Sequence, residues 1–434
     1  MIKIVNAKLA DGSMVDVEIQ NNLISKVSKS SGAKSGEVLD ATGKMLLPGL
    51  VDLHTHLREP GREDAETVLS GSTSAVAGGY TAISSMANTN PVADTAGVVE
   101  QIYRLGKDAG LCDVNPIGAV TKGIKGEQLA ELGAMADSIA AVRIFSDDGN
   151  CVADPLIMRR ALEYVKTYNG IIAQHAQEPR LTINAQMNEG SVSARIGLPG
   201  WPAIAEEAII ARDILLAEHV QSRLHICHVT TAGGVELIRW AKKRGIQVTA
   251  EVTPHHLLLT DELVENYDPI YKVNPPLRTQ KDVMALREGL AEGVIDVVAT
   301  DHAPHSEEHK DCEWQAAAFG MLGLETSLSV VIKTMIESKL MDWSQLVDRM
   351  SVRPAQIAGY KTQGQSIKEG SVANLLLLDT SSNWQVDRNK MKSKSRNTPF
   401  QGMTLPGVIT DVIYNGNFSM KSGNVMSMNS GNNG

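Results

Sequence analysis

The sequence predicts an α/β protein: a (β/α)8 TIM-type barrel with a small composite β domain from the N- and C-terminal segments. Three observations favour this architecture. Between residues 48 and 351, apolar β-type segments alternate with stretches of helical length and spacing. These segments are continuously apolar, as parallel strands buried on both faces are. Polar residues follow several non-adjacent segments, and a closed barrel brings such ends around one point, which an open doubly wound sheet does not.

Length and composition limit the choices further. The chain has 434 residues, so one large and one small domain are expected. Its hydrophobic share of 43% and charged share of 21% are typical of soluble globular proteins. A net charge of −9 without long charged runs argues against a nucleic-acid partner. Because no apolar stretch could span a bilayer and the first residues do not resemble a signal peptide, we expect a cytoplasmic protein without a membrane partner.

Both ends of the chain predict short strands separated by turns. In the first segment, Asp11-Gly12 and Asn21-Asn22 are turn signals between apolar runs. Short strands return near the other end of the chain, at residues 371–380, 406–416 and 417–423. We expect residues 1–47 and 352–434 to form the composite β domain, and the barrel to occupy residues 48–351. Residues from about 424 onward are low in complexity and are expected to be disordered.

Eight segments are predicted to be barrel strands. They are residues 45–56, 80–89, 111–120, 140–146, 170–176, 223–230, 246–253 and 294–302. Most of the stretches between them show amphipathic helical spacing, and residues 154–168 and 205–220 are the best examples. Eight strand–helix units in this order are typical of a parallel barrel.

The first predicted barrel strand ends in two histidines, within VDLHTHLREPG at residues 51–61. Because side chains alternate along a strand, His54 and His56 point to the same side, toward the mouth of the barrel. Two imidazoles placed in this way can bind one metal ion. For this motif alone, a pair of loop histidines bonded to the backbone is an equal alternative.

Other predicted strands also end in histidine or aspartate. Asp147 and Asp148 follow the fourth strand, His175 and His228 end the fifth and sixth, and Asp301 ends the eighth. Any one of these is more typical of a structural residue, but five converging strand ends are hard to explain by chance. Four histidines and two carboxylates exceed the ligand set of one tetrahedral zinc, and they suit two divalent ions close together.

The cysteines do not contribute to this pattern. They are scattered and none forms a CxxC pair, which argues against a disulfide framework and against a thiolate zinc site. A metal ion in this protein would therefore be bound by histidine and carboxylate. The four cysteines are Cys112, Cys151, Cys227 and Cys312.

Paired histidines on strand one, single histidines on strands five and six, and aspartate on strand eight resemble the amidohydrolase superfamily. Further motifs resemble the dihydroorotase family within it, of the bacterial type with aspartate at strand four. The resemblance covers nearly the whole chain, with the motifs in the family's order. They are VDLHTHLREPG, SMANTNP, FSDDG, VTPHHLLLTD, KVNPPLR, ATDHAPH and NTPFQGMTLPG.

The resemblance implies two divalent metal ions, with Zn2+ as the expected metal. Many relatives bridge their ions with a carboxylated lysine, but the segment AAVRIFSDD contains no lysine. An aspartate is therefore the expected bridge, and Asp147 is the rival of Asp148 for it. The implied ligands are His54, His56 and Asp301 for one ion, His175 and His228 for the other, and Asp148 as the bridge.

A substrate pocket is implied beside the metal ions. An arginine suits a carboxylate because its guanidinium can bind both oxygens, and Arg58 lies two residues after His56. A surface ion pair of Arg58 with Glu59 or Asp64 is the alternative. The implied substrate contacts are Arg58, Asn88 and His305 for a carboxylate, Asn274 for a ring amide, and Phe319 and Gly320 along the ring. The remaining histidines are interpreted as structural or solvent-facing: His219, His225, His255, His256, His302 and His309.

The implied reaction is the reversible hydrolysis of (S)-dihydroorotate to N-carbamoyl-L-aspartate in de novo pyrimidine (UMP) biosynthesis. A hydroxide bridging the two metal ions attacks the ring amide, and Asp301 acts as general base and then as general acid. A related cyclic amidase, hydantoinase or allantoinase, is one alternative. An inactive homologue that scaffolds aspartate carbamoyltransferase is another. The resemblance also implies a homodimer, with aspartate carbamoyltransferase as a candidate partner.

Overall fold

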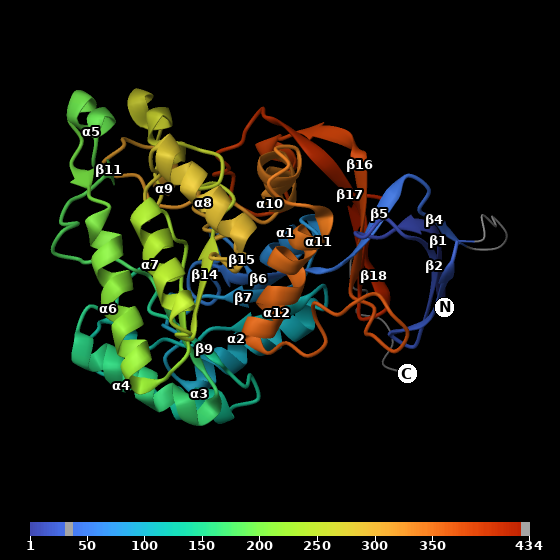
Figure 1. Ribbon diagram of the computed structural model, residues 1–434, viewed down its shortest axis with the longest axis horizontal. Coiled ribbons are helices and arrows are strands. Elements are labelled where there is room, and N and C mark those ends of the chain that lie inside the picture. The colour runs from blue at the N-terminus through green and yellow to red at the C-terminus, as the bar shows by residue number, and fades with distance from the viewer. Residues whose placement is uncertain (31–37, 427–434) are drawn as a thin grey trace.

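The computed structural model describes residues 1–30 and 38–426 and confirms the predicted fold class (Figure 1). A barrel surrounded by helices occupies one side of the molecule, and a sheet made from both ends of the chain occupies the other. The tail was predicted to be disordered from about residue 424, but Asn424–Val425 form a strand paired with the preceding one, so this boundary was wrong. The rest of that tail, residues 427–434, lies outside the described residues.

Eight short strands form the barrel. They are β6 (Leu50–Thr55), β7 (Tyr80–Ser85), β8 (Asp113–Pro116), β9 (Ile144–Phe145), β10 (Ile171–Gln174), β13 (Leu224–Ile226), β14 (Val248–Val252) and β15 (Val297–Val298). All ladders between them are parallel. Isolated parallel bridges from Thr55 to His302 and from Gly118 to Phe145 join the three-stranded sheet to the five-stranded one, which closes the barrel.

Helices connect the barrel strands and cover the outside of the barrel (Figure 1). They are α1 (Val68–Ala77), α2 (Ala96–Ala109), α3 (Leu132–Asp137), α4 (Pro155–Val165), α6 (Ile204–Val220), α7 (Ala232–Lys243), α8 (Gln280–Glu292), α10 (Ser327–Val331), α11 (Trp343–Val347) and α12 (Arg353–Ala358). Helix α8 illustrates the local chemistry: the Thr279 side chain accepts from the Asp282 N–H at its start, and Gly293 ends it in a left-handed conformation. Its residues Leu286 and Leu290 are buried in the main core.

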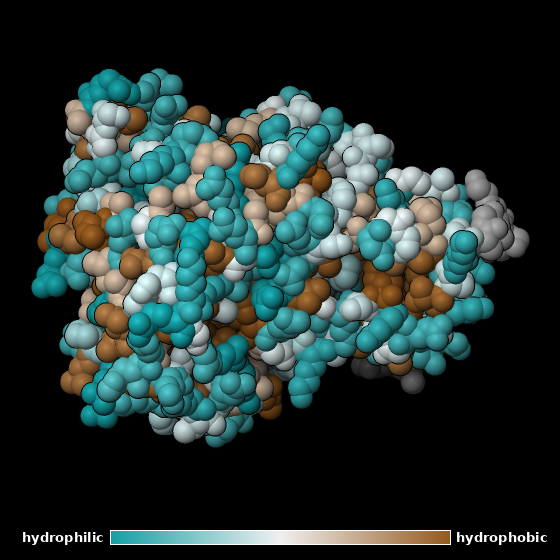
Figure 2. Space-filling model, viewed as in Figure 1, coloured by the Kyte–Doolittle hydropathy of each residue, from teal (hydrophilic) through white to brown (hydrophobic). Residues whose placement is uncertain are grey.

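Smaller elements occupy the connections. They are β11 (Met187–Asn188), β12 (Gly200–Trp201), α5 (Ser191–Ile196), α9 (Glu307–Lys310), the 3-10 turns Lys122–Ile124, Lys166–Tyr168, Asp261–Asn266, Pro269–Tyr271 and Arg388–Lys390, and the π-helical turns Ile332–Ile336 and Asp348–Val352. In residues 1–30 and 38–426, no helix combines the length and the apolar character that crossing a membrane requires. The face drawn in Figure 2 is largely hydrophilic, with hydrophobic residues in small groups.

A nine-stranded sheet combines strands from both ends of the chain. They are β1 (Ile2–Lys8), β2 (Met14–Gln20), β3 (Leu23–Lys29), β4 (Leu39–Asp40), β5 (Lys44–Pro48), β16 (Leu375–Gln385), β17 (Thr404–Tyr414), β18 (Asn417–Lys421) and β19 (Asn424–Val425). The order is β19-β18-β17-β16-β5-β1-β2-β3, with β4 beside β1. The antiparallel pair β5–β16 joins the two ends of the chain. The predicted boundaries between this domain and the barrel, after residues 47 and 351, stay a prediction.

The predicted first barrel strand, residues 45–56, was wrong in one respect. Its first part is β5 in the nine-stranded sheet, and its second part is β6 in the barrel. Gly49 lies between them, where a Cβ would come within 2.2 Å of the Thr81 side chain. The apolar run continues through this point because both sheets bury their strands here, so the hydrophobic pattern alone does not mark the change of sheet.

Candidate metal centre and substrate pocket

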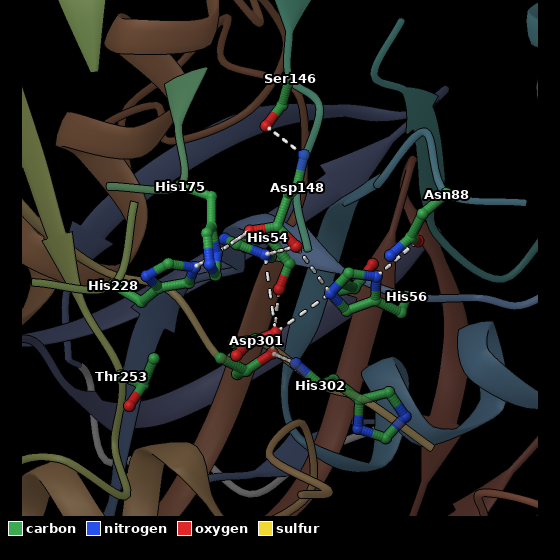
Figure 3. Close-up of polar contacts among 12 residues, drawn as sticks. His54, His56, Asn88, Ser146, Asp148, His175, His228, Thr253, Asp301 and His302 are labelled. Carbon is green, nitrogen blue, oxygen red and sulfur yellow. Dashed lines mark hydrogen bonds and ion pairs between the residues drawn. The ribbon is translucent and has the colours of Figure 1, made fainter. Parts of the chain in front are cut away.

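The six predicted metal ligands converge at the carboxyl-terminal end of the barrel (Figure 3). His54 lies within β6, and the others lie within three residues of a barrel strand's end. Each is at most 5% exposed, so bulk water is largely excluded from their polar atoms. The barrel therefore brings together the residues that the strand-end pattern predicted. They are His54, His56, Asp148, His175, His228 and Asp301.

Asp148 lies between two pairs of histidines. Its Oδ2 is 3.4 Å from His54 Nε2 and 3.3 Å from His56 Nε2. Its Oδ1 is 3.2 Å from His175 Nδ1 and 3.0 Å from His228 Nε2. Each pair forms with Asp148 a set of ligand atoms that lie within 4.8 Å of one another, which is close enough to hold one metal ion. A carboxylate with one oxygen toward each set has the geometry that a bridging ligand needs.

Asp301 adds a second carboxylate to the first set. Its Oδ1 lies 3.1 Å from His56 Nε2 and 3.5 Å from His54 Nε2. Burial alone would raise the pKa of Asp301, but the imidazoles of His54 and His56 hold this pKa below its ordinary value. The pKa of Asp148 is shifted in the same way. Burial alone would raise it, but the surrounding imidazoles, His54 foremost, hold it well below its ordinary range. Both side chains are therefore carboxylates.

Outer hydrogen bonds determine which nitrogen of His54 and His56 faces the centre. His54 Nδ1–H donates to Glu251 Oε1 at 2.6 Å, and His56 Nδ1–H donates to Asn88 Oδ1 at 2.8 Å. The Nε2 atoms therefore face the centre, where they carry the metal-binding lone pair once the imidazoles are neutral, and His54 Nε2 has no hydrogen-bond partner among the described residues. Metal-binding histidines commonly have outer partners of this kind.

His175 and His228 show most clearly that the site fits a cation. Gln177 Oε1 accepts a hydrogen bond of 2.7 Å from His175 Nε2–H, which leaves the Nδ1 lone pair directed inward. This Nδ1 lies 3.0 Å from His228 Nε2, and both nitrogens contact Asp148. In their neutral forms, both nitrogens can bind the same metal ion together with the Asp148 carboxylate, which suits a cation at this point. Nitrogen and oxygen donors without thiolate suit Zn2+ and other divalent ions.

Asp147, the rival for the bridge, serves the neighbouring turn instead. Its Oδ1 accepts from the N–H groups of Val120 at 2.8 Å and Thr121 at 2.9 Å, and the Thr121 hydroxyl donates to Oδ2. Burial raises the pKa of Asp147. The carboxylate is thus occupied by the segment after β8. It belongs to none of the groups of possible ligand atoms among the described residues, which are the two above and a third of His54, Cys227 and Glu251.

Arg58 and His305 lie together beside the cluster. Arg58 Nε donates to the Pro304 carbonyl at 3.1 Å, and its Nη2 lies 3.4 Å from His305 Nε2. The His305 Nε2–H donates to the Phe319 carbonyl at 2.8 Å. Burial, reinforced by Arg58, lowers the pKa of His305 to about 2, so this imidazole is neutral. Within the described part of the chain, Arg58 has no carboxylate within ion-pair distance, so the surface ion pair considered as its alternative does not form.

The other predicted substrate contacts line the same region. Asn88 Oδ1 is used by His56, which leaves the Nδ2 donor for a ligand. Asn274 Oδ1 is buried without a hydrogen-bond partner among the residues described. Gly320 has φ of +144°, and a Cβ at this position would come within 2.7 Å of His305 Nε2. Only glycine fits so close to the histidine in this conformation.

Glu251 is a functional residue that the sequence reasoning missed. Its Oε1 accepts from His54 Nδ1–H, and its Oε2 lies 3.0 Å from His225 Nε2. Burial alone would raise its pKa, but the neighbouring imidazoles, His54 foremost, hold this pKa far below its ordinary range. His225 was interpreted as structural, and its contact with Glu251 helps to hold the carboxylate that orients His54. An acidic residue in the middle of the apolar segment 246–253 was the available signal.

Comparison with known sequences identifies the family of this chain. A family profile described as Dihydro-orotase-like matches residues 43–233. A protein named dihydroorotase from Streptomyces coelicolor is 62% identical over 417 residues, covering 96% of this chain and 97% of that one. Dihydroorotases from Leifsonia xyli subsp. xyli and Mycobacterium tuberculosis are 57% and 51% identical over 98% and 96% of this chain, and 97% of each of theirs is covered.

Solved structures show the same architecture. An L-hydantoinase (dihydropyrimidinase) from Arthrobacter aurescens superposes with a TM-score of 0.86 at 26% identity, covering 98% of this chain and 97% of that one. A D-hydantoinase from a Thermus species has a TM-score of 0.82 at 23% identity over 98% and 97% of the two chains, a likeness of fold alone. Because identity to the dihydroorotases extends over nearly the whole chain, this chain belongs to the dihydroorotase family of the amidohydrolase superfamily, the cyclic amide hydrolases of pyrimidine biosynthesis.

Proposed function

We propose that this chain interconverts (S)-dihydroorotate and N-carbamoyl-L-aspartate at a pair of divalent ions, with Zn2+ as the expected metal. The observation that carries the proposal is the position of Asp148, with one oxygen toward each of two histidine pairs. Two ions bound there would polarise the amide carbonyl and activate a water molecule. Proton transfer and substrate binding are assigned to side chains of the protein.

The ligand assignment follows the two sets of converging atoms. The buried carboxylates offset part of the charge of two divalent ions, and the outer partners Glu251, Asn88 and Gln177 keep the imidazoles in the orientation that binding needs. The proposed ligands are His54, His56 and Asp301 for one ion, His175 and His228 for the other, and Asp148 for both.

Asp301 is proposed to carry the proton. Its carboxylate lies at the mouth of the barrel with Oδ1 beside His56 Nε2, and the neighbouring imidazoles keep it ionised. It can therefore accept the proton of the attacking water and then donate it to the leaving ring nitrogen. In the direction of ring closure, Asp301 takes the proton from the ureido nitrogen instead.

The substrate carboxylate is proposed to bind beside the metal ions. The guanidinium of Arg58 has no carboxylate partner among the described residues, the Nδ2 of Asn88 is a free donor, and His305 lies next to Arg58. A carboxylate fixed in this way holds the ring in one orientation toward the cluster, which supplies part of the rate. Asn274 is proposed to bind the ring amide, and the backbone at Phe319 and Gly320 to line the ring.

A hydantoinase or allantoinase activity is the second candidate, because the solved structures most like this fold include hydantoinases. The unpaired Arg58 favours dihydroorotate, because simple hydantoins lack its exocyclic carboxylate. An inactive scaffold is disfavoured because all six implied ligands are present and buried together. A homodimer and association with aspartate carbamoyltransferase stay predictions from the family, and a cytoplasmic location stays a prediction from the sequence.

A direct assay tests the proposed function. The rates of ring opening of dihydroorotate, hydantoin, 5-substituted hydantoins and allantoin would be measured with one preparation of the enzyme. We expect kcat/KM for dihydroorotate to exceed the others by at least about 10³-fold, because a pocket built for a carboxylate discriminates strongly against ligands without one. Equal or faster turnover of a hydantoin would reverse the assignment.

A further inference from the structure

Residues 391–398, which we call the C-terminal strap, lie far from the barrel strands in sequence but are deeply buried. They precede β17, and Ser393, Ser395 and Asn397 are only 1%, 4% and 3% exposed. Buried polar side chains outside regular secondary structure require hydrogen-bond partners. The partners of these three lie in loops that carry the proposed carboxylate-binding residues.

The carboxamide of Asn397 joins two of these loops. Its Nδ2 donates to the carbonyls of Ala303 at 2.9 Å and Gly320 at 3.2 Å, and its Oδ1 accepts from the N–H of His305 at 3.2 Å. Its backbone carbonyl accepts from the N–H of Leu322 at 3.1 Å. One side chain therefore uses both of its N–H donors and its oxygen to hold the loop that ends at His305 against the loop at Phe319–Gly320.

This link determines the shape of the proposed pocket. The two loops approach so closely that a Cβ on Gly320 would lie 2.7 Å from His305 Nε2. His305 donates to the Phe319 carbonyl at 2.8 Å, and its ring lies 3.4 Å from Arg58 Nη2. Loosening the link would therefore move the His305 imidazole relative to the Arg58 guanidinium, and it would change the space for a carboxylate between them.

The C-terminal strap also anchors the loop that carries Arg58. Glu66, which is 0% exposed, accepts from the Lys394 N–H at 3.1 Å and from the Ser393 hydroxyl. The same carboxylate lies 3.4 Å from Nε2 of His302, the residue that follows Asp301 in the chain. The hydroxyl of Ser395 donates to the Ala65 carbonyl at 2.8 Å. The strap thus reaches the two loops that provide Arg58 and His305 through separate contacts.

We propose that Asn397 is a positioning residue for the substrate carboxylate: its carboxamide fixes the distance between His305 and the Phe319–Gly320 backbone without touching the substrate. The proposal rests on the proposed binding of the carboxylate by Arg58 and His305. The backbones of these two loops are joined by an isolated β-bridge between His302 and Met321, not by a regular β-ladder. The relative position of His305 and Phe319–Gly320, which lie beyond this bridge, therefore depends on side-chain contacts of this kind.

The chain offers a matched control in Asn374. Its side chain is also buried, at 5% exposure, and it makes the same kinds of bond: Nδ2 donates to the Thr362 carbonyl at 2.9 Å, and Oδ1 accepts from the Asn415 N–H at 2.7 Å. Asn374 precedes β16 in the nine-stranded sheet. Asn374→Ala therefore removes comparable hydrogen bonds at a place where the proposal expects no effect on substrate binding.

The test measures kcat, KM for dihydroorotate, the dissociation constant of orotate, metal content and Tm for each variant. Asn397→Ala should raise KM and weaken orotate binding by about 10- to 100-fold at unchanged metal content, because a displacement near 1 Å has effects of this size. Asn397→Asp, of almost the same volume, places an oxygen against two carbonyls and should act in the same direction. Asn374→Ala should lower Tm and leave KM unchanged.

Two results would overturn the proposal. One is a KM and orotate affinity within about twofold of the wild type in both Asn397 variants, which is within ordinary surface-mutation scatter. The other is an equal rise of KM in Asn374→Ala, which would make the effect one of general stability. Arg58→Lys, measured in parallel, distinguishes failure of the positioning proposal from failure of the proposed carboxylate pocket. If Arg58→Lys raises KM and Asn397→Ala does not, only the positioning role of Asn397 is wrong. If neither variant raises KM, the proposed carboxylate pocket is wrong too.

Discussion

The proposed metal cluster and the proposed carboxylate pocket lie side by side at one end of the barrel, but they are built differently. The cluster's side chains come from strands or from positions within three residues of a strand end, and they contact one another through Asp148. The pocket's residues lie on loops that are held by the C-terminal strap, residues 391–398. The barrel therefore fixes the first region, and a remote part of the chain fixes the second.

Among the substitutions considered, the largest loss of metal and of turnover is expected at Asp148. Asp148→Ala removes the ligand shared by both sets, so we expect bound metal to fall from about two ions to at most about one per chain and turnover to fall by at least about 10³-fold. Inductively coupled plasma mass spectrometry measures the bound metal, and a dihydroorotate assay measures the turnover. Asp147→Asn is the control, because Asp147 bonds to Val120 and Thr121 instead. A greater loss of metal in the control would reassign the bridge.

Asp301→Asn should separate proton transfer from metal binding. The amide keeps an oxygen near His56 but accepts no proton, so kcat should fall by at least about 10²-fold while part of the metal is retained. The pH profile should also lose the acidic limb that ionisation of Asp301 imposes. Turnover near that of the wild type would end the proposed role of this carboxylate.

In the pocket, Arg58→Lys should affect binding more than metal content. Lysine keeps the charge but loses the planar pair of donors, so we expect KM for dihydroorotate to rise by about 10- to 100-fold with kcat less affected. Metal content serves as the control, because Arg58 is not a proposed ligand. An unchanged KM would mean that the substrate carboxylate binds elsewhere.

The smallest effect is a pH dependence of stability where the C-terminal strap is anchored. Glu325 accepts from the N–H groups of Lys392 and Ser393, and burial raises its pKa to about 7. A carboxyl whose pKa is raised by folding contributes stability below its unfolded pKa, and this contribution is lost as the pH rises through about 7. Glu325→Gln stays neutral, so its Tm relative to the wild type should rise between about pH 5 and about pH 8. A constant difference in Tm would contradict this reading.

The two regions also differ in how far the sequence predicted them. The ligands were identifiable because each follows an apolar strand, and because alternation places His54 and His56 on one side. Glu251 was missed although it is an acidic residue within an apolar segment, and Asn397 was not identified because its role depends on contacts that only the folded chain brings together. Asn397 is 92 residues from His305 along the chain, and no local pattern marks such a pair. The division of residues 45–56 between two sheets was missed because both parts are equally apolar.

Anomalous diffraction from crystals of active enzyme can show whether Asp148 joins two metal ions. The dihydroorotate assay is run on the same preparation. The account predicts two anomalous peaks, one between Asp148 and the pair His54 and His56, and one between Asp148 and the pair His175 and His228. Fully active crystals without a peak at either position would contradict it.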